Sequence, residues 1–75
     1  MYGINVKFKE YSGWSERSYT YLSDVPYEKN QALVVPAGKW YDVVKVVGCR
    51  ENPQLKKDVK YKKVLAPLEL FIAED

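Results

Sequence analysis

The stretch that decides the fold is residues 32–49, which read Ala-Leu-Val-Val-Pro-Ala-Gly-Lys-Trp-Tyr-Asp-Val-Val-Lys-Val-Val-Gly-Cys. A short apolar run at 33–35 is followed by turn residues at 36–39 and by a long β-branched run at 40–47. Four valines in five positions disfavour a helix, because β-branched side chains lose χ1 freedom there, whereas a pleated sheet accommodates them. Both faces of 40–47 carry apolar residues, so we expect this strand to coil around a small core, with a bulge or bend at Gly48.

The residues before this stretch predict two more strands. Residues 4–9 alternate apolar and polar side chains without a break, so their apolar half is expected to face the core. Residues 18–22 are rich in β-forming side chains and are expected to pair with 4–9 through a hairpin loop over 11–17. Residues 1–3 are expected to fray.

The residues after it predict two further strands. Residues 50–54 contain turn formers and predict a loop, and residues 59–66 predict the fourth strand. Pro67 is expected to interrupt this strand. Residues 68–72 alternate weakly and fit either a short final strand or one irregular turn, of which we predict the strand. Residues 73–75 are expected to fray. The side chains of 59–66 that we expect to face inward are Val59, Tyr61 and Leu65.

This pattern predicts an all-β protein. Five short strands separated by turns are typical of a small, strongly bent antiparallel barrel of the SH3-like or OB-like kind. No stretch of ten residues has the helical period, and the chain has 75 residues, so we expect one domain over 1–75.

Composition argues against several classes of protein. No apolar run approaches the ~20 residues of a membrane span, and the N-terminus does not resemble a signal peptide. Cys49 is the single cysteine, which leaves no internal disulfide and favours a reducing, cytoplasmic location. Without histidine, and with one cysteine, the chain lacks the usual ligands of a metal site, so we expect no metal and no cofactor.

The sequence also predicts that the protein is not an enzyme. Without histidine, a catalytic base would have to be a carboxylate or a lysine. Asp42 is the one acid embedded in an apolar strand, and we interpret it as a structural residue that opposes a basic side chain across the sheet. Residues 36–39 lack the spacing of a phosphate-binding loop.

Aromatic residues are the most informative excess, with seven tyrosines, two tryptophans and two phenylalanines. A core this small holds about five or six large rings, because each ring buries on the order of 150–250 Å². Several rings are therefore expected at the surface, where they serve protein interfaces or base stacking. By alternation we place in or near the core Phe8, Tyr21, Tyr41 and Tyr61. Loops and a hairpin mouth carry Tyr11, Trp14, Tyr27 and Trp40.

Charge is nearly balanced overall, at +2, but residues 56–63 alone carry five lysines against one aspartate. Lys60, Lys62 and Lys63 form a basic stripe that suits an acidic or phosphate-bearing partner. Such lysines also protect an edge strand from pairing with other chains. This structural role is the more common one for lysines on an edge strand.

Two binding modes compete. In the favoured one, Trp14, Tyr27 and Trp40 dock on a partner protein while the lysine stripe meets an acidic surface. In the alternative, the lysines and Arg17 follow the phosphates of DNA or RNA while exposed rings stack on bases. The modest net charge favours the protein partner slightly.

Four segments resemble small β-barrel proteins of tailed bacteriophages. They are Tyr-Thr-Tyr-Leu at 19–22, Leu-Val-Val-Pro at 33–36, the valine run at 43–47 and Tyr-Lys-Lys-Val-Leu at 61–65. A Gly-Asp pair that those proteins carry before the valines is Asn-Gln in this chain, at 30–31. Asn tolerates the left-handed conformation, so the turn is preserved.

This resemblance implies a non-catalytic accessory protein that binds and inhibits or remodels a host complex of transcription, replication or defence, such as RNA polymerase. It also implies a monomer or weak dimer. Residues 17–48 are similar, in addition, to the amino-terminal DNA-3′-end-binding domain of the primosomal replication-restart helicase, although no binding residue carries over from that domain.

Overall fold

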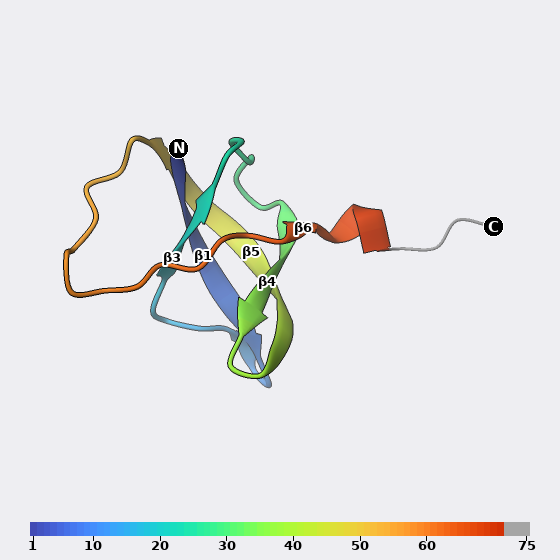
Figure 1. The fold of residues 1–75 in the computed structure, drawn as a ribbon. Coiled ribbons are helices and arrows are strands. Elements are labelled where there is room, and N and C mark those ends of the chain that lie inside the picture. Colours follow the sequence, from blue (N-terminus) through green and yellow to red (C-terminus); the bar gives the residue numbers. More distant parts are fainter. Residues whose placement is uncertain (72–75) are drawn as a thin grey trace.

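The two longest strands, β1 (Tyr2–Glu10) and β5 (Trp40–Glu51), pair antiparallel in the middle of the sheet. The structure is a computed structural model that describes residues 1–71. β3 (Tyr19–Ser23) pairs with the other side of β1, and β4 (Ala32–Ala37) with the other side of β5. The strand order is therefore β3-β1-β5-β4, with every pair antiparallel (Figure 1).

The valine-rich stretch forms β5 and contains the expected irregularity. Asn5 of β1 pairs with Gly48, whereas Val6 pairs with Val46, so Val47 is an extra residue on β5. A β-bulge of this kind bends the strand that carries it and increases its twist. The bulge expected at Gly48 is thus confirmed next to that glycine.

The β4–β5 hairpin turns through two residues, Gly38 and Lys39. Gly38 has φ of 60°, a left-handed value that glycine adopts without steric cost. A positive φ at the first central residue is typical of a II′ turn, whose twist matches that of the flanking strands. The turn predicted over 36–39 is therefore shorter than expected, because Pro36 and Ala37 belong to β4.

Three short elements complete the described chain. β2 (Gly13–Trp14) folds back on the end of β1, inside the segment predicted as a loop. β6 (Ala66–Pro67) pairs with β4, and η1 (Leu68–Phe71) is a 3₁₀ helix at the far end. Figure 1 shows η1 projecting from one side of the sheet and the long loop after β5 projecting from the other. The structure thus has six strands where five were predicted.

The strand predicted over 59–66 is wrong. Only Ala66 lies in a strand, and Lys63 makes an isolated parallel bridge with Leu22. Leu22 donates its amide to the Lys62 carbonyl at 2.9 Å and accepts a 2.9 Å hydrogen bond from the Val64 amide. This segment is held by the edge of β3 rather than by an alternating apolar face. Val59 and Leu65, predicted to face inward, are accordingly exposed.

The strand predicted over 68–72 is also wrong. Residues 68–71 form η1, and Ile72 lies outside the described residues, as do residues 73–75. Pro67 has a φ fixed near −65°, which is close to the value of a 3₁₀ helix, so the chain turns instead of continuing straight.

The core lies on one face of β1, β3, β4 and β5. Its fully buried side chains alternate along the strands as predicted, and the cluster consists of Ile4, Val6, Tyr21, Leu33, Val35, Val44 and Val46. Tyr41 was predicted near the core but is 56% exposed, because it lies on the opposite face from Val44 at the end of the hairpin. Tyr2 and Gly3, predicted to fray, pair with strands on both sides.

The structure therefore confirms a small antiparallel all-β fold. The finer expectation of an SH3-like or OB-like barrel stays a prediction. Within residues 1–71, no helix is long and apolar enough to cross a membrane.

Candidate functional site

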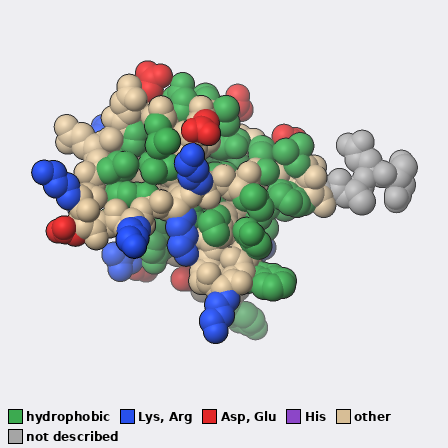
Figure 2. Space-filling view, viewed as in Figure 1, with side chains coloured by type: hydrophobic (Ala, Val, Ile, Leu, Met, Phe, Trp, Pro, Cys, Tyr) green, Lys and Arg blue, Asp and Glu red, His purple; other side chains and the backbone are tan. Residues whose placement is uncertain are grey.

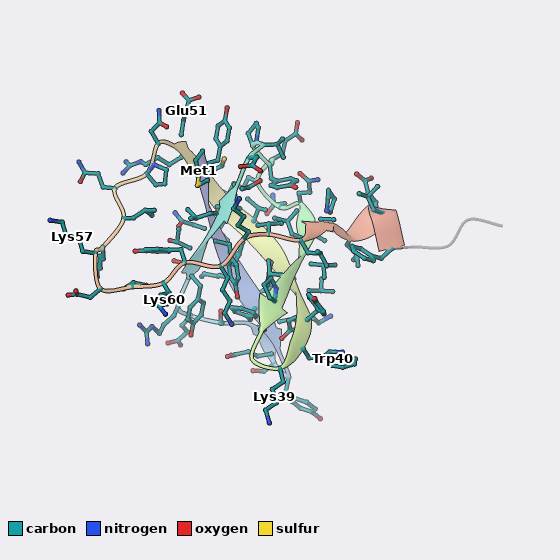
Figure 3. The ribbon with its side chains drawn as sticks, in the orientation of Figure 1. Met1, Lys39, Trp40, Glu51, Lys57 and Lys60 are labelled. Carbon is teal, nitrogen blue, oxygen red and sulfur yellow. The ribbon has the colours of Figure 1, made fainter. Side chains whose placement is uncertain are left out.

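A groove of about 780 Å³ opens where the loop between β5 and β6 passes the outer end of β3. One wall comes from β3 and the end of β1, and the β4–β5 hairpin closes the base. The opposite wall is Lys56 and residues 59–62 of the loop, including Lys60 (Figure 3). Figure 2 shows that basic side chains gather over this segment on the same face of the molecule.

Aromatic rings form the wall on the sheet side. Phe8 packs edge-to-face against Tyr19, with ring centroids 5.2 Å apart, and against Tyr21 at 6.3 Å. Tyr19 remains 42% exposed, so its ring is accessible in the groove. The Arg17 guanidinium lies 5.8 Å from the Tyr19 centroid and adds a positive charge beside that ring.

Tyr21 anchors this wall to the hairpin. Its hydroxyl donates a 2.9 Å hydrogen bond to the Pro36 carbonyl. Burial raises the pKa of Tyr21, and the nearby Asp42 carboxylate and Tyr19 raise it further. The hydroxyl therefore stays protonated at neutral pH and keeps its role as a donor. This bond fixes the base of the groove.

The loop wall supplies lysines. Lys56, Lys60 and Lys62 all line the groove, together with the half-buried ring of Tyr61. The Lys56 amide donates a 3.1 Å hydrogen bond to the Tyr61 hydroxyl, which closes the loop on itself. The acids that line the groove are Glu10 and Asp42, so basic groups outnumber acidic ones along it.

Ser15 holds the β1–β3 connection in place. Its side chain is buried, its hydroxyl accepts a 3.1 Å hydrogen bond from the Phe8 amide, and it donates one at 2.7 Å to the Arg17 carbonyl. Its own amide donates to the Phe8 carbonyl at 2.8 Å. These bonds fix the loop that presents Arg17 and Tyr19 to the groove.

We expect Ser15→Ala to lower the free energy of unfolding by about 1–3 kcal/mol, because the Phe8 amide and the Arg17 carbonyl each lose a partner. Urea unfolding followed by tryptophan fluorescence measures this loss. Ser18→Ala is the matched control, since Ser18 is exposed, and it is expected to change stability by less than about 0.5 kcal/mol. Equal effects of the two substitutions would contradict the role of Ser15.

The predicted site residues are only partly brought together. Lys60 and Lys62 line the groove and Arg17 lies beside Tyr19. Lys63 lies just past the groove, with its ammonium 4.0 Å from the exposed Asp24 carboxylate.

The three aromatic residues predicted to form one patch come from three different parts of the chain. Trp14 is on β2, where the Lys45 ammonium sits 4.9 Å from its ring centroid. Tyr27 packs partly against the core, and Trp40 is 79% exposed at the start of β5 (Figure 3). No ring–ring pair joins any of these three within residues 1–71.

Sequence reasoning missed three members of the groove, namely Phe8, Tyr19 and Lys56. Tyr19 is two residues before Tyr21 and therefore projects from the same face of β3, which was the available signal. Lys56 belongs to the basic run 56–63, but the sequence does not indicate that it faces Tyr19. Its position depends on the path of an irregular loop.

The part of the chain that the structure describes holds no cluster of histidine, cysteine or acidic residues suited to a metal ion. Comparison of this chain with protein-family models, with curated proteins and with solved structures found no match. The resemblance to phage proteins and to the helicase domain therefore stays a prediction.

Proposed function

We propose that the groove binds single-stranded nucleic acid. The observation that carries this proposal is the juxtaposition of an accessible ring, Tyr19, with three lysines of the facing loop, Lys56, Lys60 and Lys62. Proteins that bind single strands combine these two features, since bases stack on aromatic rings and lysines follow the phosphates. Their spacing across one open groove suits a flexible strand whose bases are unpaired.

The structural arrangement favours this mode over the protein partner that the sequence favoured slightly. That partner was expected to meet a single patch of Trp14, Tyr27 and Trp40, whose rings make no ring–ring contact with one another within residues 1–71. Lys60 and Lys62, which were expected to serve either mode, line a groove together with aromatic rings. A net charge of +2 is modest for such a protein, so we expect binding that weakens steeply with salt.

The first test measures binding of a fluorescent oligothymidine by anisotropy at about 50 mM salt. Tyr19→Ala is expected to lower the affinity about 5- to 150-fold, because one stacked base contributes about 1–3 kcal/mol. Tyr19→Phe keeps the ring and is expected to retain most of the affinity. Tyr11→Ala removes a more exposed ring that lies outside the groove and is expected to have no effect.

The second test addresses the lysines. Lys60→Gln combined with Lys62→Gln is expected to reduce the slope of log affinity against log salt by about 1.4, since each single-strand phosphate contributes about 0.7. Lys29→Gln combined with Lys57→Gln removes the same charge outside the groove, where Lys57 points away from the molecule (Figure 3). No binding by the parent protein, or equal losses in both pairs, would overturn the proposal.

A second candidate function follows from the hairpin tip. Trp40 and Tyr41 are 79% and 56% exposed beside Lys39, and exposed aromatic residues are common anchors of protein interfaces. We propose this tip as the contact for the activity that the phage resemblance implies, which is stoichiometric binding of a host machine such as RNA polymerase. Binding to purified bacterial RNA polymerase, lost in Trp40→Ala but kept in Tyr19→Ala, is the expected result. Absence of binding by the parent would overturn this candidate.

A further inference from the structure

The outer face of the sheet, opposite the core, carries a second basic cluster. Side chains alternate between the two faces of β1, and Val6 is buried on the core face. Lys7 and Lys9 therefore lie on the outer face. On β5 the outward side chain between the buried Val44 and Val46 is Lys45. None of these three lysines lines the groove.

Two of these lysines face each other directly. Lys7 and Lys45 are paired residues of the β1–β5 ladder, so their Cβ atoms are about 4.5–5.5 Å apart. Like charges in this arrangement repel one another and destabilise the pairing. Neither lysine has a carboxylate within 4.0 Å among residues 1–71, where the salt bridge is Lys63 to Asp24. Within residues 1–71, no carboxylate therefore offsets this repulsion.

Trp14 holds this cluster in place. Trp14 pairs with Lys9 on the edge of β1, yet the Lys45 ammonium, from the strand on the other side of β1, lies 4.9 Å from its ring centroid. The Trp14 ring and the Lys45 side chain therefore meet across β1. A cation–π contact of this kind orients the Lys45 ammonium over the Trp14 ring.

We propose that this outer face binds the phosphate backbone of double-stranded nucleic acid. Two lysines at paired positions without an acidic partner suit the phosphates of a nucleic-acid backbone, which relieve the repulsion between like charges. The single ring on this face is already engaged by Lys45, so the face offers charge rather than a free stacking surface. A duplex presents its phosphates outward and keeps its bases paired, which fits that chemistry. The inference concerns a surface distinct from the groove and does not depend on it.

The experiment titrates the full chain with a fluorescent 20-base-pair duplex and, separately, with oligothymidine. Lys7→Gln combined with Lys45→Gln is expected to lower duplex affinity at least about ten-fold at 50 mM salt and to reduce the salt slope by about 2. Oligothymidine binding is expected to be unchanged in this variant. Lys60→Gln combined with Lys62→Gln is expected to show the reverse pattern, so a failure of either surface is seen independently.

Two controls keep the result interpretable. Lys29→Gln combined with Lys57→Gln removes the same charge away from both surfaces and is expected to leave the duplex affinity within about two-fold of the parent. Lys7→Glu places opposite charges across the ladder. This variant is therefore expected to have a melting temperature equal to or above that of the parent and to lose duplex binding. Trp14 fluorescence, read in a Trp40→Phe background, is expected to change on adding duplex but not oligothymidine.

The proposal is overturned if the parent does not bind the duplex, or if the control pair loses as much affinity as Lys7→Gln with Lys45→Gln. It is also overturned if inorganic phosphate at millimolar concentration displaces the duplex at constant ionic strength, which would indicate a site for the free ion. Retention on vesicles of anionic phospholipid without duplex binding would assign the face to a membrane surface instead.

Discussion

Leu33→Ala is expected to destabilise the protein by about 2–5 kcal/mol, the largest effect of any substitution considered. Leu33 is fully buried in β4, where it pairs with Val44 on one side and with Pro67 on the other. Truncation removes apolar contact and leaves a cavity that surrounding strands fill only in part. A domain of 75 residues has a total stability of about 4–11 kcal/mol, so this one change removes a large share of it.

Chemical denaturation monitored by tryptophan fluorescence and by circular dichroism measures this loss. Leu65→Ala is the matched control, because it deletes the same atoms from a side chain that is 51% exposed. We expect the control to cost well under half as much as Leu33→Ala. Similar midpoints for the two variants would show that Leu33 does not occupy the core described above.

Gly3→Ala is expected to lower the free energy of unfolding by about 1–3 kcal/mol, through overpacking. A Cβ atom at position 3 would lie 2.8 Å from both Cβ and Cγ of Pro53, far inside van der Waals contact. Gly3 is paired on both sides, with Leu22 and with Arg50, so its backbone has little room to move away. The displaced group would be Pro53, which begins the loop that carries the groove lysines.

Gly48→Ala provides the comparison, because its Cβ would meet only Asn5 at ordinary contact distances of 3.7 and 3.9 Å. We expect this substitution to leave stability unchanged within about 1 kcal/mol. Pro53→Gly removes both atoms that clash, so combining it with Gly3→Ala is expected to cost less than the sum of the single effects. Strict additivity in that double-mutant cycle would contradict the clash. Gly3→Ala is also expected to weaken oligothymidine binding, since it shifts the loop.

The fold was predictable where side-chain pattern and local geometry agree. Unbroken alternation over 4–9 placed Ile4 and Val6 in the core, and the valine run of β5 could belong only to a sheet. The bulge beside Gly48 was also anticipated, since a glycine after a long β-branched run marks a place where a strand can bend.

The C-terminal third was not predictable in the same way. Residues 59–66 show an approximate period of two, yet Val64 rather than Leu65 packs on the core. The position of that segment is set by backbone hydrogen bonds to Leu22, which any sequence without proline can make. The side-chain pattern does not depend on these backbone bonds. The strand predicted from the period of two therefore could not be corrected from the sequence.

The same limit applies to the candidate site. Lys60 and Lys62 were selected from composition alone, and the groove does contain them. The rings that they face were not predicted to lie beside them. The approach of Tyr19 to the loop depends on how residues 52–62 cross the end of β3. The opposed pair Lys7 and Lys45 was equally hidden, since it depends on the register of two strands 38 positions apart in the sequence.

The hydrogen bonds of residues 62–65 have a consequence for biosynthesis. These residues bond to Leu22 of β3 and, through the Leu65 amide at 3.0 Å, to the Val34 carbonyl of β4. A nascent chain that has just completed β5 therefore still has bare edges on both outer strands. At ribosomal rates of about 5–20 residues per second, the missing segment follows within roughly one to three seconds. During that interval the polypeptide is most prone to aggregate through these edges, and a chaperone that shields unpaired strands would act then.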